Sequence, residues 1–257
     1  MKQFKKSTKI LWIIPTILLA FGVSLGALTW FNFEIASSPI IPVKPNTPKS
    51  IADNTEPLFD KLEFSTTDPS SIWVITNKQH PLTPIEYTPT DLVNTNGATI
   101  SNKAVADFEA MLAAARAESI TLTAMSSYRS YSHQNSLYNN YITQYGQIIA
   151  DTFSAKPGYS EHQVGLAIDF GSIYEPGCNF DTCFNNTIDG AWLAANASKY
   201  GFLLRYTAEK QSITGYKAES WHYRYIGRKL AAEMKKQSIV TLEEFFKISG
   251  GEIYLQQ

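Results

Sequence analysis

The chain has 257 residues, of which 18% are charged and 44% are hydrophobic. This composition is typical of folded proteins and excludes a wholly disordered chain, and the length allows one or two domains. With 22 basic and 23 acidic residues the formal net charge is −1. Because no overall basic field is present, we expect no nucleic-acid partner.

A basic and apolar segment opens the chain. Four lysines (Lys2, Lys5, Lys6 and Lys9) precede an uncharged run over residues 10–33. A helix of that length spans about 36 Å, enough to cross a bilayer core of about 30 Å. We therefore predict a cytoplasmic tail and a single transmembrane anchor over residues 1–33, with the N-terminus inside because the lysines precede the run. A cleaved signal peptide is the alternative, although its apolar region is normally only about 7–15 residues long.

The composition changes after this run. Residues 34–69 are mostly polar and contain several spaced prolines, among them Pro39, Pro42, Pro45, Pro48 and Pro57. Closely spaced prolines favour an extended, semi-rigid chain. We predict an extended linker over residues 34–69, which holds a folded domain, residues 70–257, on the outer side of the membrane.

Helical and strand patterns are mixed in this domain. Residues 72–77 and 120–126 are rich in β-forming side chains and predict strands, as do residues 202–206 and 220–225. Helices are expected at residues 132–149, 188–200 and 227–236, and a helical stripe of buried residues is expected between the first two strands: Val105, Phe108, Met111, Leu112 and Ala115. Gly201 favours a left-handed cap, and Thr241 with Glu244 resembles a capping box that opens a last short helix. Because strands and helices do not alternate strictly, we expect an α+β fold with a small antiparallel sheet flanked by helices.

Two segments contain side chains that can bind a metal. Ser160 to Asp169 contains His162, and a second segment contains Glu219 and His222. A catalytic zinc ion typically takes three nitrogen or oxygen ligands and keeps one position for water. One interpretation is that His162, Asp169 and His222 hold the metal and Glu219 acts as the base; the alternative is that the histidines are structural. Both separations within a segment are odd, so a turn or bulge is needed to bring the side chains together.

The arrangement Ser-x-His-x-x-Gly-x-Ala-x-Asp followed by Glu-x-Trp-His resembles the VanY-type D-alanyl-D-alanine carboxypeptidases. These are zinc peptidases of the group that includes the lysostaphin-like and hedgehog-like folds. The resemblance covers roughly residues 70–235 and includes Ser127-Tyr128-Arg129-Ser130, Tyr200 to Tyr206, and Trp221 to Gly227. Ser220 is a departure, because the family usually has proline between the glutamate and the tryptophan.

The resemblance implies one zinc ion on the sheet, held by His162, Asp169 and His222, with Glu219 as the base that takes a proton from water and passes it to the leaving amine. It also implies that Arg129 pairs with the free carboxylate at the end of the substrate, a task that suits a guanidinium fork. By the same resemblance, Gln134 and Ser160 are expected to bind substrate.

Cys178 and Cys183 are the two cysteines of the chain. With no histidine beside them, a structural zinc site lacks ligands. Outside the membrane a disulfide that closes a short loop is expected, and two reduced thiols are the alternative.

The sequence therefore predicts a membrane-anchored zinc D,D-carboxypeptidase on the cell-wall side, which removes the C-terminal D-alanine from peptidoglycan stem peptides. An L,D-carboxypeptidase or an endopeptidase acting on the same peptides is one alternative. A non-catalytic, zinc-containing wall-binding module is another, and the intact Glu219 disfavours it.

Overall fold

A computed structural model describes residues 58–255 of the chain. The predicted anchor, 1–33, and most of the predicted linker, 34–57, lie outside the described residues. Across 58–255, no helix is both long and apolar enough to cross a bilayer. The described end of the predicted linker, 58–69, contains neither helix nor strand. Its Phe59 ring stacks on Trp73, with ring centroids 5.5 Å apart.

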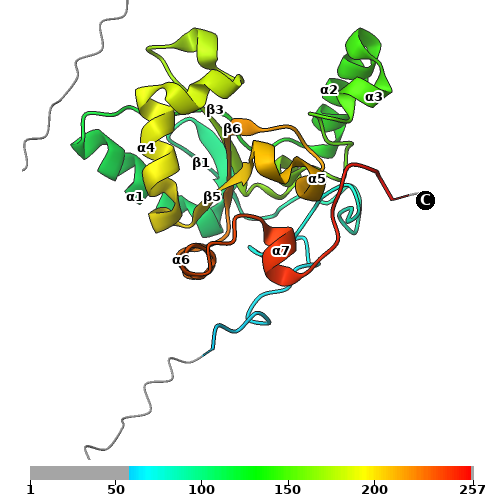
Figure 1. Cartoon of the computed structure of the whole chain (residues 1–257), viewed down its shortest axis with the longest axis horizontal. Coiled ribbons are helices and arrows are strands. Elements are labelled where there is room, and N and C mark those ends of the chain that lie inside the picture. Colours follow the sequence, from blue (N-terminus) through cyan, green and yellow to red (C-terminus); the bar gives the residue numbers. More distant parts are fainter. Residues whose placement is uncertain (1–57, 256–257) are drawn as a thin grey trace, which may run out of the picture. The chain divides into compact units, whose positions relative to one another are not determined.

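The described part of the chain forms two antiparallel sheets with helices around them (Figure 1). The strands are β1 (Leu92–Thr95), β2 (Ala98–Ser101), β3 (Thr123–Ser126), β4 (Ala167–Gly171), β5 (Phe202–Tyr206) and β6 (Glu219–Tyr225). The α-helices are α1 (Asn102–Ala117), α2 (Tyr131–Tyr145), α3 (Gln147–Ala150), α4 (Ile188–Asn196), α5 (Gln211–Thr214), α6 (Arg228–Lys236) and α7 (Leu242–Phe246). The main sheet has the order β3-β4-β6-β5, and β1 pairs with β2 as a hairpin. The predicted α+β class is confirmed.

One face of the main sheet forms the larger hydrophobic core. Ile168 and Phe170 of β4 and Tyr223 of β6 belong to one buried cluster with Phe108 of α1. The Phe108 and Phe170 ring centroids are 6.3 Å apart. Side chains alternate between the two faces of a strand, so the residues between these apolar ones point the other way. They are buried polar groups, Asp169 of β4 and His222 and Arg224 of β6.

Several predicted elements are confirmed. Helix α1 buries Phe108, Met111 and Leu112, as the helical stripe predicts. Gly201 is left-handed, with φ 79°, and ends the 3₁₀ helix η4 (Ala197–Tyr200) that follows α4. Thr241 caps α7, because its side chain accepts a hydrogen bond from the backbone N–H of Glu244.

The predicted strand over Ile72–Asn77 is wrong. Residues 73–77 are buried, but in the predicted strand only Asn77 pairs like a strand, in an isolated bridge with His80. The Nη2 atom of Arg224 donates to the carbonyl oxygens of Ile72 and Val74, at 3.2 and 2.8 Å. The guanidinium of Arg224 therefore binds backbone carbonyls that would otherwise be available to accept hydrogen bonds from a neighbouring strand.

Two other regions differ from the prediction. The helix expected at 132–149 is divided into α2 and α3 by Gly146, whose φ is 80°. The hairpin of β1 and β2 was not predicted, although its turn, Asn96-Gly97, has φ of 46° and 81°. Asn-Gly is the dipeptide that two-residue hairpin turns favour, because both positions need positive φ.

Candidate active site

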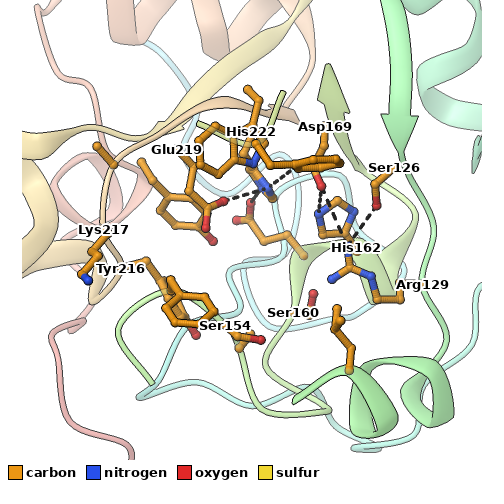
Figure 2. Close-up of a pocket in the computed structure, with 18 of the residues that line it drawn as sticks. Ser126, Arg129, Ser154, Ser160, His162, Asp169, Tyr216, Lys217, Glu219 and His222 are labelled. Atoms are coloured by element: carbon orange, nitrogen blue, oxygen red, sulfur yellow. Dashed lines mark hydrogen bonds and ion pairs between the residues drawn. The ribbon is translucent and has the colours of Figure 1, made fainter. Parts of the chain in front are cut away.

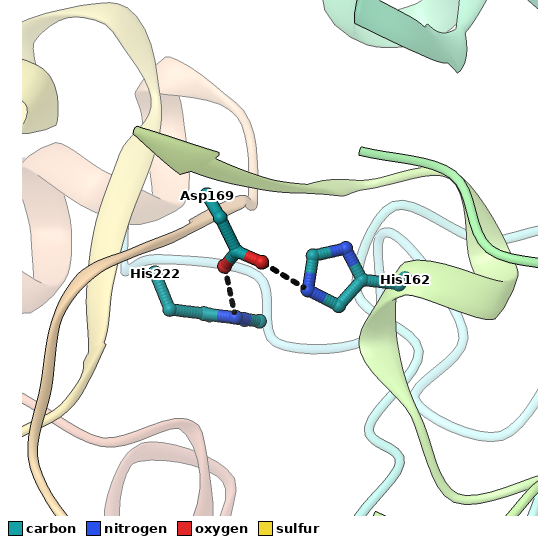
Figure 3. Close-up of side chains that lie close together, drawn as sticks. All are labelled: His162, Asp169 and His222. Carbon is teal, nitrogen blue, oxygen red and sulfur yellow. Dashed lines mark hydrogen bonds and ion pairs between the residues drawn. The ribbon is translucent and has the colours of Figure 1, made fainter. Parts of the chain in front are cut away.

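The structure brings His162, Asp169 and His222 together (Figure 3). Asp169 and His222 are paired neighbours on β4 and β6, and His162 lies on the 3₁₀ helix η1 (Glu161–Val164), which ends at the left-handed Gly165. The Nε2 atom of His162 is 3.2 Å from Asp169 Oδ2, and His222 Nδ1 is 3.1 Å from Asp169 Oδ1. All three side chains are buried, and their ligand atoms lie within 4.8 Å of one another.

This trio fits a zinc ion by its donor set, two imidazole nitrogens and one carboxylate. Its electrostatics also favour a cation. Burial lowers the pKa of His222, but hydrogen bonds to Asp169 and Glu161 outweigh that effect and raise the pKa to about 9. The surrounding carboxylates thus favour a positive charge at this position. Burial lowers the pKa of His162, which favours the neutral form that a metal ligand needs.

The position of Glu219 depends on an irregularity in β6. Leu204 of β5 pairs with Tyr223, but Tyr206, two residues on, pairs with Glu219. The extra residues in β6 form a bulge, which places Glu219 and His222 on the same side despite their odd separation. Glu219 Oε2 is 3.6 Å from His222 Nδ1. Burial raises the pKa of Glu219 to about 8, against an opposing effect of His222.

Arg129 lies beside the trio and points into the same cavity (Figure 2). Its Nη2 atom is 3.8 Å from Asp169 Oδ2 and donates to Ser126 Oγ at 2.9 Å. Nη1 donates to Gln134 Oε1 at 2.8 Å, while Gln134 Nε2 donates to the carbonyl of Ala155 at 2.7 Å. Gln134, which was expected to bind substrate, lines the cavity and fixes the guanidinium of Arg129.

The cavity has a volume of about 890 Å³. Ser160, Trp221 and Phe180 contribute to its wall. It joins the three candidate ligands, Glu219 and Arg129 in one space, which is large enough for the end of a peptide.

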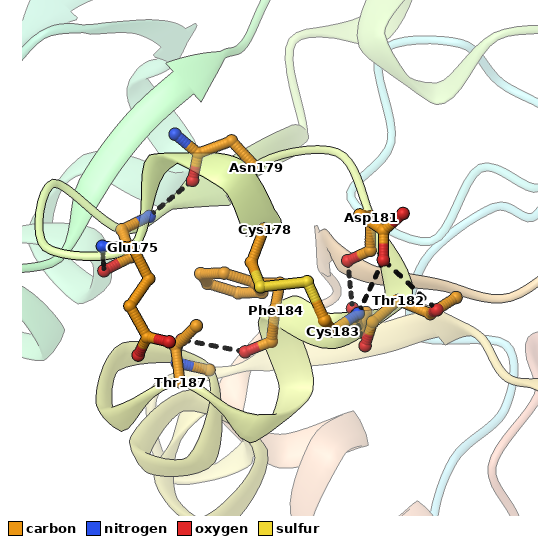
Figure 4. The surroundings of a disulfide bond; sticks show 11 residues. Glu175, Cys178, Asn179, Asp181, Thr182, Cys183, Phe184 and Thr187 are labelled. Atoms are coloured by element: carbon orange, nitrogen blue, oxygen red, sulfur yellow. Dashed lines mark hydrogen bonds between the residues drawn. A yellow bond between two sulfur atoms is a disulfide. The ribbon is translucent and has the colours of Figure 1, made fainter. Parts of the chain in front are cut away.

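A disulfide joins Cys178 and Cys183 (Figure 4), which decides between the two alternatives for this pair. The loop that it closes contributes Phe180, Asp181 and Thr182 to the cavity wall. Ser220, the departure from the family pattern, donates from Oγ to the carbonyls of Asp181 and Thr182, at 3.2 and 3.4 Å. A proline could not make these hydrogen bonds, so Ser220 links β6 to the disulfide loop.

The sequence analysis missed Glu161, which lies next to His162 within the Ser-Glu-His motif. Its side chain is fully buried, and Oε2 is 3.2 Å from His222 Nε2. A buried carboxylate beside a ligand histidine cannot be inferred from spacing, because its partners are far away in the chain.

Comparison with known proteins agrees with this geometry. Residues 97–228 match the family model of VanY, D-alanyl-D-alanine carboxypeptidase. A D-alanyl-D-alanine carboxypeptidase of Enterococcus faecalis is 28% identical over 262 residues, which cover 95% of this chain and 92% of that protein. The solved structure of the LdcB LD-carboxypeptidase has a TM-score of 0.64 at 38% identity, covering 70% of this chain and 88% of that one. A vancomycin-resistance D,D-pentapeptidase, VanY, solved in complex with Zn(II), has a TM-score of 0.58 at 30% identity, covering 67% of this chain and 97% of that one.

Two imidazoles and a carboxylate beside a buried glutamate, in a cavity that also holds an arginine, define a site of the metallopeptidase class. The chain belongs to the VanY family of carboxypeptidases. The predicted resemblance and the predicted enzyme class are both confirmed.

Proposed function

We propose that this protein is a zinc-dependent D,D-carboxypeptidase that removes the C-terminal D-alanine from peptidoglycan stem peptides. The observation that carries the proposal is the position of Arg129, whose guanidinium lies in the cavity 3.8 Å from a carboxylate oxygen of the metal trio. A terminal carboxylate bound there holds the last peptide bond beside the metal site. Bonds farther inside a peptide do not offer that carboxylate, so the arginine favours removal of the terminal residue.

The residues of the chain divide the chemistry between them. His162, Asp169 and His222 would hold the zinc ion, which supplies Lewis-acid polarisation of the scissile carbonyl and lowers the pKa of water. Glu219 takes a proton from the attacking water and gives it to the departing amine. The water oxygen forms a bond to the carbonyl carbon, the C–N bond breaks, and D-alanine leaves with its carboxylate on Arg129.

L,D-cleavage is the second candidate, and a specific observation favours it. The LdcB LD-carboxypeptidase is 38% identical to this chain, while the D,D-pentapeptidase is 30% identical. An L,D-carboxypeptidase would use the same metal trio, base and arginine on the shortened tetrapeptide. The difference lies in which stereochemistry the cavity accepts at the residue before the scissile bond.

The test uses the purified chain, either loaded with zinc or treated with a chelator. It is incubated with a muramyl pentapeptide and, separately, with the matching tetrapeptide, and the products are identified by mass. Chelator-sensitive loss of one alanine from the pentapeptide alone supports D,D-cleavage, and loss from the tetrapeptide alone moves the function to L,D-cleavage. Cleavage of neither peptide, with binding to wall peptides retained, would point to the non-catalytic module.

The membrane anchor remains part of the proposal. Residues 10–33 would hold the enzyme at the cell membrane, with the catalytic domain on the cell-wall side, where its substrate is found. The protein should be found in the membrane fraction. Protease added to intact spheroplasts should digest its catalytic domain. A domain that resists protease until the cells are lysed would contradict this orientation.

A further inference from the structure

A group of buried charges lies beneath the metal trio, on the sheet face opposite the hydrophobic core. Its centre is Glu161, whose side chain is fully buried. Glu161 Oε1 accepts from Arg205 Nε at 2.8 Å and from Arg224 Nη1 at 3.0 Å. The other oxygen, Oε2, is 3.2 Å from His222 Nε2.

The two arginines are held on their remaining sides by other groups. Arg205 makes a two-pronged contact with Glu243, at 2.9 and 2.7 Å. Arg224 donates from Nη2 to two backbone carbonyls and from Nε to a third, that of Tyr225. Both guanidiniums therefore direct their donors at Oε1 from fixed positions. This arrangement leaves Oε2 to face the imidazole.

We propose that Glu161 is a positioning residue that fixes the tautomer of His222, holding the proton on Nε2 so that the lone pair of Nδ1 faces the metal. The proposal rests on the metal site of the proposed function and assigns a task to a residue outside that site. An ionised carboxylate only accepts hydrogen bonds, so Nε2 must donate to it. Metal-binding histidines commonly have such a partner on the ring nitrogen that does not bind the metal.

His162 shows the same arrangement with a different acceptor. Its Nδ1 atom is 2.6 Å from the carbonyl oxygen of Ser127, and its Nε2 atom faces Asp169. A carbonyl oxygen also only accepts hydrogen bonds, so the proton of the His162 ring lies on Nδ1, the nitrogen that faces away from Asp169. On each candidate ligand ring, the nitrogen on the Asp169 side is thus left to bind the metal.

The decisive variant is Glu161→Gln, which has nearly the same shape. A glutamine has one carbonyl oxygen, and the donors of Arg205 and Arg224 both require it. Its NH₂ group must then face His222 Nε2, which has to become the acceptor. The imidazole proton moves to Nδ1, where it blocks the metal.

The matched control is Glu243→Gln. Glu243 is a buried carboxylate that binds the same Arg205, but Arg205 and Glu161 both lie between it and His222. The zinc dissociation constant of both variants and of the wild type is measured by competition with a chromophoric chelator. Glu161→Gln should weaken zinc binding roughly 10- to 100-fold, and Glu243→Gln should leave it unchanged. In ¹⁵N spectra of the zinc-loaded wild type, the His222 proton should be found on Nε2.

Equal zinc affinity in Glu161→Gln and the wild type overturns the proposal, as does an equal loss in both variants, which would show that the buried charges act only on the fold. If Glu161→Gln does not fold, the charge-balanced double variant Glu161→Gln/Arg224→Gln is compared with Arg224→Gln alone. Weaker zinc binding in the double variant than in Arg224→Gln supports the proposal, and equal zinc binding overturns it. The assay contains no peptide. A zinc-binding wild type that cleaves nothing would therefore refute the proposed function without affecting this inference.

Discussion

Replacing Arg129 by alanine tests how the enzyme selects the end of a peptide. The guanidinium is 16% exposed and is held by Gln134 and Ser126, which each use one of its N–H donors. The fork has further donors, and these are the ones that a substrate carboxylate would bind. Alanine removes the fork and leaves the substrate carboxylate facing water or the nearby Asp169.

The size of the effect follows from the contacts that are lost. A hydrogen bond to a charged group contributes about 1.5–3 kcal/mol, and a bidentate carboxylate makes two. Because the cavity is open and water can replace part of this interaction, we expect a loss of about 3 kcal/mol, or roughly 100-fold in kcat/KM. A substrate with an amidated C-terminus lacks the charge, so it should lose much less.

The assay compares kcat/KM for the free-acid and amidated forms of one peptide, with the wild type, Arg129→Ala and Arg129→Lys. Zinc content is measured alongside, because Arg129 lies 3.8 Å from Asp169. Lysine keeps the charge without the fork and should fall between the other two enzymes. An Arg129→Ala enzyme that contains zinc and still strongly prefers the free acid would refute the assigned role.

Three further substitutions test the roles of the proposed base, of a metal ligand and of the disulfide loop. Glu219→Gln should retain zinc but lower kcat about 10²–10⁴-fold, the usual contribution of general acid–base catalysis; turnover at the wild-type rate would exclude this residue as the base. His222→Ala should lose both zinc, by metal analysis, and turnover, and full zinc occupancy would show that another ligand replaces it. Replacing Cys178 and Cys183 by serine opens a loop with a sequence separation of 5. In the loop-entropy model this lowers the free energy of unfolding by about 2 kcal/mol, or about 4–8 °C in Tm, and an unchanged Tm measured calorimetrically would contradict it.

Much of the fold could be predicted because its signals are local. The stripe of α1, the glycine after Tyr200 and the cap at Thr241 each depend on neighbours within a few residues. The candidate ligands were selected by residue type and by resemblance, not by geometry. Their spacing argued against a shared face, and the structure removes that difficulty through the bulge in β6 and the turn at Gly165.

Two of the features that sequence analysis missed depend on contacts between distant segments. Residues 72–77 have the composition of a strand, but their carbonyls are bound by Arg224, about 150 positions away. Glu161 lies among polar residues at the start of its motif, so its neighbours in the sequence do not indicate that it is buried. Its partners, Arg205 and Arg224, come from distant strands. Local propensity carries no information about such pairings.

The buried charges also determine how far the chain can be shortened. The segment that matches the family model ends at residue 228 and begins at 97, but Glu243 and the carbonyls of Ile72 and Val74 lie outside it. An excised fragment over the matched residues would leave Arg205 and Arg224 without these partners, and an uncompensated buried charge costs about 3–5 kcal/mol. The indole of Trp73, which donates to the carbonyl of Ile226 at 3.0 Å, would also be lost. The smallest autonomously folding piece is therefore longer than the segment that matches the family model, and trimming from either end past Trp73 or Glu243 should yield insoluble protein.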